Sequence, residues 1–170
     1  MSRTLITVAL LIVVGAIAGI LFTRSRAMAV PEQPIPFSHR THTESGVQCL
    51  FCHSGAPRSP VSGIPSVQKC MGCHNVIAID SPAIQEVAGY WERGEAIPWV
   101  RVNAQPDFID YSHQPHLGAG LNCETCHGDV GRMDAARPVG KKDMGWCLAC
   151  HLEQPEPQDA RLADCLTCHK

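Results

Sequence analysis

Ten cysteines and five of the nine histidines in this chain fall into one repeated pattern. In each copy two cysteines are separated by two residues, and a histidine follows the second cysteine at once. This Cys-x-x-Cys-His pattern attaches c-type haem, because two cysteines can form thioethers with one porphyrin while the histidine binds its iron. The predicted attachment residues are Cys49, Cys52, Cys70, Cys73, Cys123, Cys126, Cys147, Cys150, Cys165 and Cys168, and the predicted proximal iron ligands are His53, His74, His127, His151 and His169. The sequence therefore predicts five haem c groups.

The Cys-x-x-Cys spacing alone would also suit a zinc site or a redox-active dithiol. Neither of these sites needs a histidine directly after the second cysteine, yet the histidine is present in five copies out of five. No cysteine lies outside the pattern, so none is left over for structural disulfides. The counting favours haem over both alternatives.

Four histidines remain outside the motifs: His39, His42, His113 and His116. They form two His-x-x-His pairs, each at the same distance before a Cys-x-x-Cys-His motif. Residues three apart on a helical turn point to the same side, so each pair can serve two neighbouring irons. We interpret all four as distal iron ligands, while surface or satisfied core histidines are the alternative. The spacing does not fix which iron each histidine serves.

Five irons need ten axial ligands, and nine histidines leave one position without an imidazole. A methionine thioether is the next candidate, and a Met/His iron has a higher potential than one with two imidazoles. Met133 is ranked first because it lies in a polar Gly-Arg-Met-Asp context, and Met144 is the runner-up. The alternative is one five-coordinate haem.

The elements that position these residues are arranged as a repeat with an offset of 74 residues. It predicts two two-haem modules, residues 37–74 and 111–151, a fifth haem motif at 165–169 and a connecting segment, 75–110, with one helix near residues 82–93. Aromatic residues make up only 5% of the chain. We therefore expect residues 37–170 to form a mainly helical and irregular, class III-like multihaem domain with sparse secondary structure, in which porphyrins replace a conventional core.

The N-terminus carries an uncharged apolar run, Leu5–Phe22, that is long enough to cross a bilayer as a helix. We expect residues 1–26 to be a retained anchor, followed by a proline-rich tether at 27–36. A cleaved signal peptide, ending at Ala27-Met28-Ala29, is the alternative. The arginines flanking the run favour a cytoplasmic C-terminus, but covalent haem attachment takes place outside the cytoplasm. The expected location is therefore the bacterial inner membrane, crossed once, with the haem domain on the periplasmic side.

The domain after residue 26 is acidic, with eleven basic residues against sixteen acidic ones and a formal charge of −5. Such a charge argues against nucleic acid and for basic redox partners.

Several stretches resemble the pentahaem cytochrome subunit of alternative complex III, a bacterial quinol oxidoreductase. They are Ile97-Pro98-Trp99-Val100-Arg101-Val102, Tyr111-Ser112-His113, Cys126-His127-Gly128 and Met144-Gly145-Trp146-Cys147-Leu148-Ala149-Cys150-His151. The resemblance implies an electron-transfer subunit that catalyses nothing alone. It would sit beside iron-sulfur and quinone-binding subunits and deliver electrons from quinol to a periplasmic or monohaem cytochrome or an oxidase. The alternatives are a stand-alone membrane-anchored carrier, a small periplasmic shuttle, a reductase of a small oxyanion and a cytochrome filament.

Overall fold

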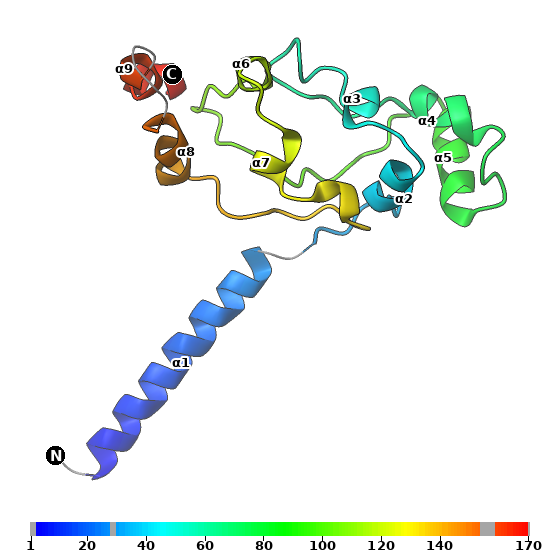
Figure 1. Cartoon of the computed structure of the whole chain (residues 1–170). Coiled ribbons are helices and arrows are strands. Elements are labelled where there is room, and N and C mark those ends of the chain that lie inside the picture. Colours follow the sequence, from blue (N-terminus) through cyan, green and yellow to red (C-terminus); the bar gives the residue numbers. More distant parts are fainter. Residues whose placement is uncertain (1–2, 28–29, 154–158, 170) are drawn as a thin grey trace.

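The computed structural model describes residues 3–27, 30–153 and 159–169. A long helix, α1 (Arg3–Ala27), projects from an elongated domain that holds all the other elements (Figure 1). Residues Arg3–Thr23 are long and apolar enough to cross a membrane, by length and composition. This confirms the helix expected at the N-terminus. A signal sequence near the N-terminus can have the same length and apolar composition.

The domain is built from short helices joined by irregular chain, as the sequence predicts. Most of them carry haem motif or His-x-x-His residues. They are α2 (His39–Glu44), α3 (Cys49–Cys52), α4 (Val67–His74), α5 (Pro82–Glu92), α6 (His113–Gly118), α7 (Cys123–His127), the 3₁₀ helix η1 (Val130–Arg132), α8 (Met144–His151), α9 (Asp159–Leu162) and α10 (Cys165–Cys168). No strand occurs within the described residues, where an isolated bridge joins Ile109 to His169.

Local capping explains where several of these helices begin. The side chain of Ser38 accepts a hydrogen bond from the Thr41 amide at the start of α2, and Asp143 caps α8 in the same way through Trp146. The predicted helix near residues 82–93 is confirmed as α5. It begins after Ser81 with proline at the first position, and Gly94 follows its end with a φ of 66° that glycine adopts without strain.

The hydrophobic core is small for a chain of this length. Of the described residues, only Ile35, Ala56, Val67, Val87 and Ile97 are buried apolar residues. Four of them form one cluster where α4 packs against α5. A core of this size does not stabilise a domain of this length by itself, which agrees with the expectation that porphyrins supply the rest.

Part of the segment expected to be a tether belongs to the domain. Ile35 is 3% exposed and lies in the core cluster. The Gln33 amide makes two hydrogen bonds of 2.9 Å with the backbone of Val100, one as donor and one as acceptor. The sequence did not show this because the contact joins residues 67 positions apart.

The two halves of the repeat brace each other. The helix α2 packs on η1, where the Arg40 amide donates to the Met133 carbonyl and the Arg40 guanidinium donates to the Arg132 carbonyl. In return, the Pro60 carbonyl of the first half accepts a hydrogen bond from the backbone amide of His113 in the second half. The relative positions of the two His-x-x-His helices are therefore fixed by contacts between the halves.

Candidate haem sites

We number the attachment motifs in chain order: motif 1 (Cys49–His53), motif 2 (Cys70–His74), motif 3 (Cys123–His127), motif 4 (Cys147–His151) and motif 5 (Cys165–His169). The structure places the histidines of α2 and α6 opposite motif histidines. The ring centres of His42 and His74 are 6.0 Å apart, those of His113 and His127 are 6.3 Å apart, and those of His116 and His151 are 5.9 Å apart. Residues distant in sequence thus form opposed histidine pairs.

These separations can be compared with those of an iron bound by two imidazoles. Two opposite metal–nitrogen bonds of about 2.0 Å place the ring centres about 6.3 Å apart. The three measured pairs therefore have the spacing that one haem iron requires. In contrast, the described residues contain no group of three or more Cys, His, Asp or Glu side chains able to hold a metal ion directly.

The remaining distal candidate is His39, which lies near both His53 and His42. Burial lowers the pKa of His39, and the nearby charges of His53 and His42 lower it further. His39 Nδ1 is buried without a hydrogen-bond partner. An orphaned buried nitrogen is expected where a bound group completes the site. The three ring pairs place His42 opposite motif 2, His113 opposite motif 3 and His116 opposite motif 4.

Hydrogen bonds fix which ring nitrogen can bind iron. In six histidines Nδ1 lies 2.7–3.0 Å from a backbone carbonyl oxygen. Because a carbonyl only accepts, Nδ1 carries the proton and donates it, and Nε2 is left to bind the metal. These histidines and the residues that supply their carbonyls are His42 with Ser38, His53 with Gly63, His74 with Ile77, His113 with Pro60, His116 with Ser112 and His151 with Leu162.

An aromatic ring contacts both histidines of each His-x-x-His pair. The sequence alone did not indicate this role for the aromatic residues. Phe37 contacts His39 and His42 with ring centres 4.9 and 4.5 Å apart, and Tyr111 contacts His113 and His116 at 4.9 Å each. Phe37 and Tyr111 are equivalent positions of the repeat. This equivalence is the signal that would have identified them.

Cysteine neighbours place the motifs in space. Burial is the largest cause that raises the pKa of the Cys123 thiol. The charge of Cys49 and a hydrogen bond between Cys123 and Cys49 raise this pKa further. Motifs 1 and 3 therefore adjoin. The Cys52 thiol, whose pKa burial raises, also interacts with Cys73, so motif 2 adjoins motif 1.

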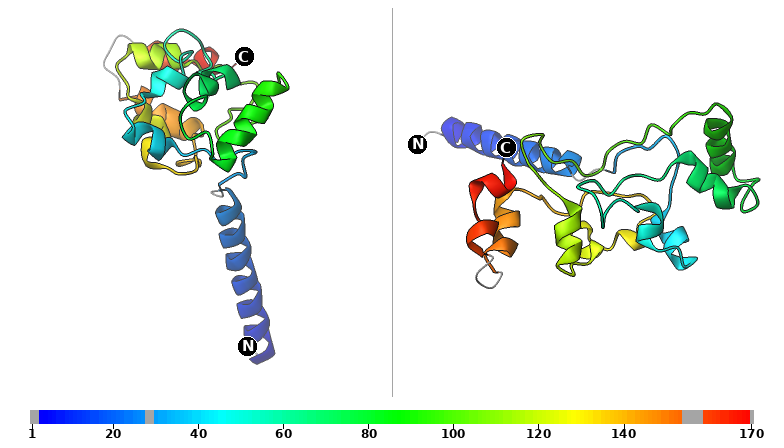
Figure 2. Two further views of the ribbon diagram at one scale, coloured as in Figure 1. Left: turned by 90° about the vertical axis from the view of Figure 1, so that its right-hand side faces the viewer. Right: turned by 90° about the horizontal axis from the view of Figure 1, so that it is seen from above.

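The second half of the chain continues the series. Burial raises the pKa of the Cys147 thiol, followed by the charges of Cys168, Asp143 and Cys126. Motif 4 therefore lies next to both motif 5 and motif 3. The spatial order of the motifs is 2, 1, 3, 4, 5, and Figures 1 and 2 show the helices α4, α3, α7 and α8 following one another along the domain in that sequence.

Motif 5 differs from the others because, in the part of the chain that the structure describes, no second histidine ring lies opposite His169. Its ring is stacked on Phe108, with centres 6.0 Å apart and 13° between the planes. Met133 lies beside α2, because its carbonyl accepts a hydrogen bond from the Arg40 amide. Met144 is 63% exposed at the start of α8, the helix whose Cys147 adjoins motif 5.

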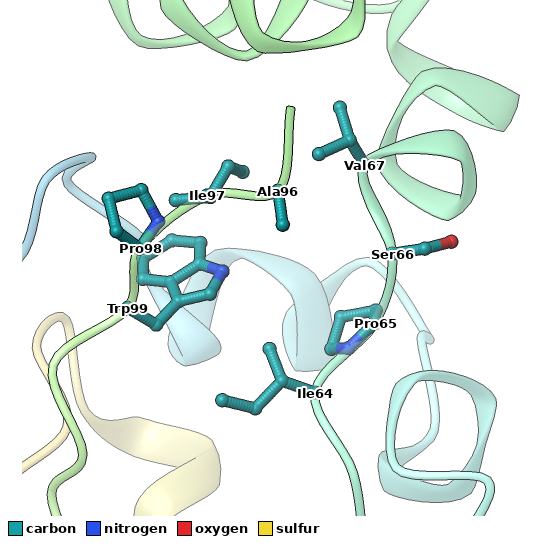
Figure 3. Close-up of a pocket in the computed structure, with 8 residues that line it drawn as sticks. All are labelled: Ile64, Pro65, Ser66, Val67, Ala96, Ile97, Pro98 and Trp99. Atoms are coloured by element: carbon teal, nitrogen blue, oxygen red, sulfur yellow. The ribbon is translucent and has the colours of Figure 1, made fainter. Parts of the chain in front are cut away.

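An apolar cavity of about 350 Å³ lies beside α4, the helix of motif 2. Figure 3 shows Ile64 and Trp99 facing each other across it, and the remaining lining residues are Pro65, Ser66, Val67, Ala96, Ile97 and Pro98. The lining suits a flat apolar group. The sequence offered Ile97, Pro98 and Trp99 only as part of a family resemblance.

Comparison with known proteins agrees with this geometry. Residues 109–170 match the family of cytochrome c7 and related cytochromes c. The chain is also 32% identical over 162 residues to the multihaem cytochrome c subunit of a menaquinone reductase from Nitratidesulfovibrio vulgaris, an alignment that covers 82% of this chain and 77% of that protein. The chain belongs to the multihaem c-type cytochromes.

This multihaem cytochrome is therefore an electron-transfer protein that holds haem c, with the mostly helical and irregular fold expected from its motifs. Haem iron accepts and releases single electrons, and the chain supplies the ligands and the packing that position it.

Proposed function

We propose that this cytochrome carries five haem c groups and conducts electrons along them within a membrane complex that exchanges electrons with quinone. The observation that supports this best is the set of histidine pairs at the spacing of a doubly ligated iron. The order of the motifs adds to it, because adjacent attachment cysteines hold successive porphyrins close together. The two ends of the series are then motif 2 and motif 5.

The residues proposed to act are those predicted from the sequence. The ten motif cysteines attach the porphyrins and the five motif histidines bind iron from one side. His39, His42, His113 and His116 bind from the other side at motifs 1 to 4. For motif 5 the methionines are the candidates, and the position of α8 supports Met144 over Met133.

The membrane assignment is part of the proposal. We infer that α1 is a retained anchor in the inner membrane and that the haem domain lies on the periplasmic side. Iron-sulfur and quinone-binding subunits would be its neighbours, and a periplasmic or monohaem cytochrome or an oxidase would be the electron acceptor. The resemblance to alternative complex III favours electrons that flow from quinol to that acceptor.

A second direction of electron flow has its own support. The relative from Nitratidesulfovibrio vulgaris is described as a subunit of a menaquinone reductase. In a complex of that kind, electrons would enter through the cytochrome and leave to quinone. A small-oxyanion reductase is less supported, because it would need an open iron position in a pocket lined by basic residues, and the basic residues are scattered along the sequence, with only Lys141 and Lys142 adjacent.

Purification from membranes tests the proposal. The intact mass should exceed that of the polypeptide by five haems that survive denaturation, and replacing both cysteines of one motif with alanine should remove one haem. Iron-sulfur and quinone-binding proteins should copurify. Rapid mixing of that complex with menaquinol, and separately with reduced cytochrome, would determine the direction. A mass that shows fewer than five haems would contradict the proposed haem number. A haem protein that purifies without other subunits would contradict the proposed membrane complex.

A further inference from the structure

His127 is the exception among the proximal histidines that have a partner across the iron site. The Nδ1 atoms of His53, His74 and His151 lie against backbone carbonyls. In contrast, His127 Nδ1 lies 3.5 Å from the side-chain nitrogen of Asn103. The oxygen of the same amide accepts a hydrogen bond of 3.4 Å from the Lys142 ammonium. An amide and a cation thus stand where the other sites have a neutral acceptor.

The Lys142 ammonium is held in this position. It also donates a hydrogen bond of 3.1 Å to the Val139 carbonyl. The Val139 side chain in turn packs on Gly128, where an added Cβ would lie 3.0 Å from Val139 Cγ1. Gly128 directly follows His127, so this packing ties the lysine to motif 3. The neighbouring Lys141 lacks such support, because its side chain is 87% exposed and it pairs with Asp143 at 3.6 Å.

The arrangement weakens His127 as an electron donor to iron. An imidazole bound through Nε2 keeps its proton on Nδ1, and a carbonyl that accepts this proton increases the basicity of the ligand. Asn103 cannot turn its oxygen to His127 without losing the bond to Lys142. The positive charge nearby also favours the less positive, reduced iron.

We propose that Asn103 and Lys142 raise the reduction potential of the haem at motif 3 above the potentials of the haems at motifs 1, 2 and 4. The inference rests on the proposed ligation of iron by His127. Motif 3 is the middle of the spatial order of the motifs. An electron that moves along the series from motif 2 therefore meets a haem of higher potential in the middle of the series, before it reaches motifs 4 and 5.

Redox titration of the full-length, haem-loaded protein, followed by visible absorption, tests the proposal. In Lys142→Met the potential of one haem should fall. In Asn103→Asp it should also fall, because a carboxylate accepts the Nδ1 proton. Lys142→Arg should restore the original potential, since it keeps the charge. The matched control is Lys141→Met, which removes the same charge one residue away and should leave that potential unchanged.

Electron paramagnetic resonance of His127→Gly identifies the haem at motif 3, because that haem loses its low-spin signal. The same haem must be the one whose reduction potential falls in Lys142→Met. An unchanged low-spin spectrum in His127→Gly would overturn the ligation itself. With the ligation intact, equal shifts in Lys142→Met and Lys141→Met, or a shift spread evenly over all haems, would overturn the role of Lys142 and Asn103.

Discussion

The imidazole rings of His113 and His127 are almost parallel, with 7° between their planes. The equivalent angle for His42 and His74 is 74°. The angle between two axial imidazole planes controls the splitting of the iron d orbitals. Parallel rings give a rhombic low-spin signal, and perpendicular rings give a strongly anisotropic one. The two sites should therefore be distinguishable by spectroscopy.

We predict that electron paramagnetic resonance of the oxidised protein contains both kinds of low-spin signal. His42→Ala should remove a strongly anisotropic component, and His113→Ala should remove a rhombic one. Each variant is the control for the other, because each loses one distal histidine of a six-residue helix, His42 from α2 and His113 from α6. Loss of the same component in both variants would contradict the pairing.

A second prediction concerns Tyr111, which contacts both distal histidines of the second half. Tyr111→Leu should lower the free energy of unfolding by about 1–3 kcal/mol, because two aromatic contacts are lost. Tyr111→Phe should change it little, since Phe37 occupies the equivalent position in the first half. Denaturant unfolding, followed through the low-spin haem spectrum, measures both. A large loss in Tyr111→Phe would mean that the hydroxyl, and not the ring, is needed.

Tyr111 also predicts a dependence of stability on pH. Burial, as the largest cause, raises the pKa of its phenol from 10.0 to about 12. Below pH 10 the phenol is protonated in both the folded and the unfolded protein, and its contribution to the free energy of unfolding is fully present. As the pH rises from 10 to about 12, the unfolded chain loses the proton first, so the free energy of unfolding falls. Tyr111→Phe should remove this part of the alkaline fall, and an identical pH profile in both proteins would contradict the assignment.

The site of His169 leads to a prediction about its sixth ligand. A thioether ligand gives a weak near-infrared band in the oxidised protein. We expect Met144→Leu to remove this band and to lower the highest haem reduction potential. Met133 lies beside α2, so Met133→Leu should leave both the band and this potential unchanged. If the band is lost in Met133→Leu, Met133 is the ligand, as the ranking of the two methionines from the sequence predicts. If no band occurs in the unaltered protein, neither methionine binds iron.

The fate of α1 can be measured directly. We predict that the protein purified from membranes retains the apolar helix, because Arg24 and Arg26 separate it from the cleavage-like Ala27-Met28-Ala29. Mass spectrometry of the intact protein decides this. A mature chain beginning at Val30 would show that the helix is a cleaved signal.

Much of this site could be predicted from the sequence because its chemistry is local. The attachment motifs, the two His-x-x-His pairs and the ends of α5 depend on residues a few positions apart. The partner of each distal histidine could not be predicted, since residues three apart on a turn are equivalent until the helix is placed. That placement comes from contacts such as Arg40 with Met133 and Pro60 with His113.

Other features depend on residues that no spacing rule connects. Ile35 reads as part of a proline-rich tether and becomes buried through the Gln33 contact with Val100. Asn103 and Lys142 are 39 residues apart and belong to no motif. Such residues are recognised only when the fold brings them to one place.

The helices α2 and α6 have six residues each, and each carries the two histidines that we propose as ligands of two different irons. A helix this short forms few internal hydrogen bonds and is not stable alone. During maturation of the protein, the first haem to bind a helix therefore orders it and presents the second histidine to the neighbouring site. Haem incorporation is then cooperative within each half of the chain. A defect that prevents loading of one motif would therefore also slow the loading of its neighbour.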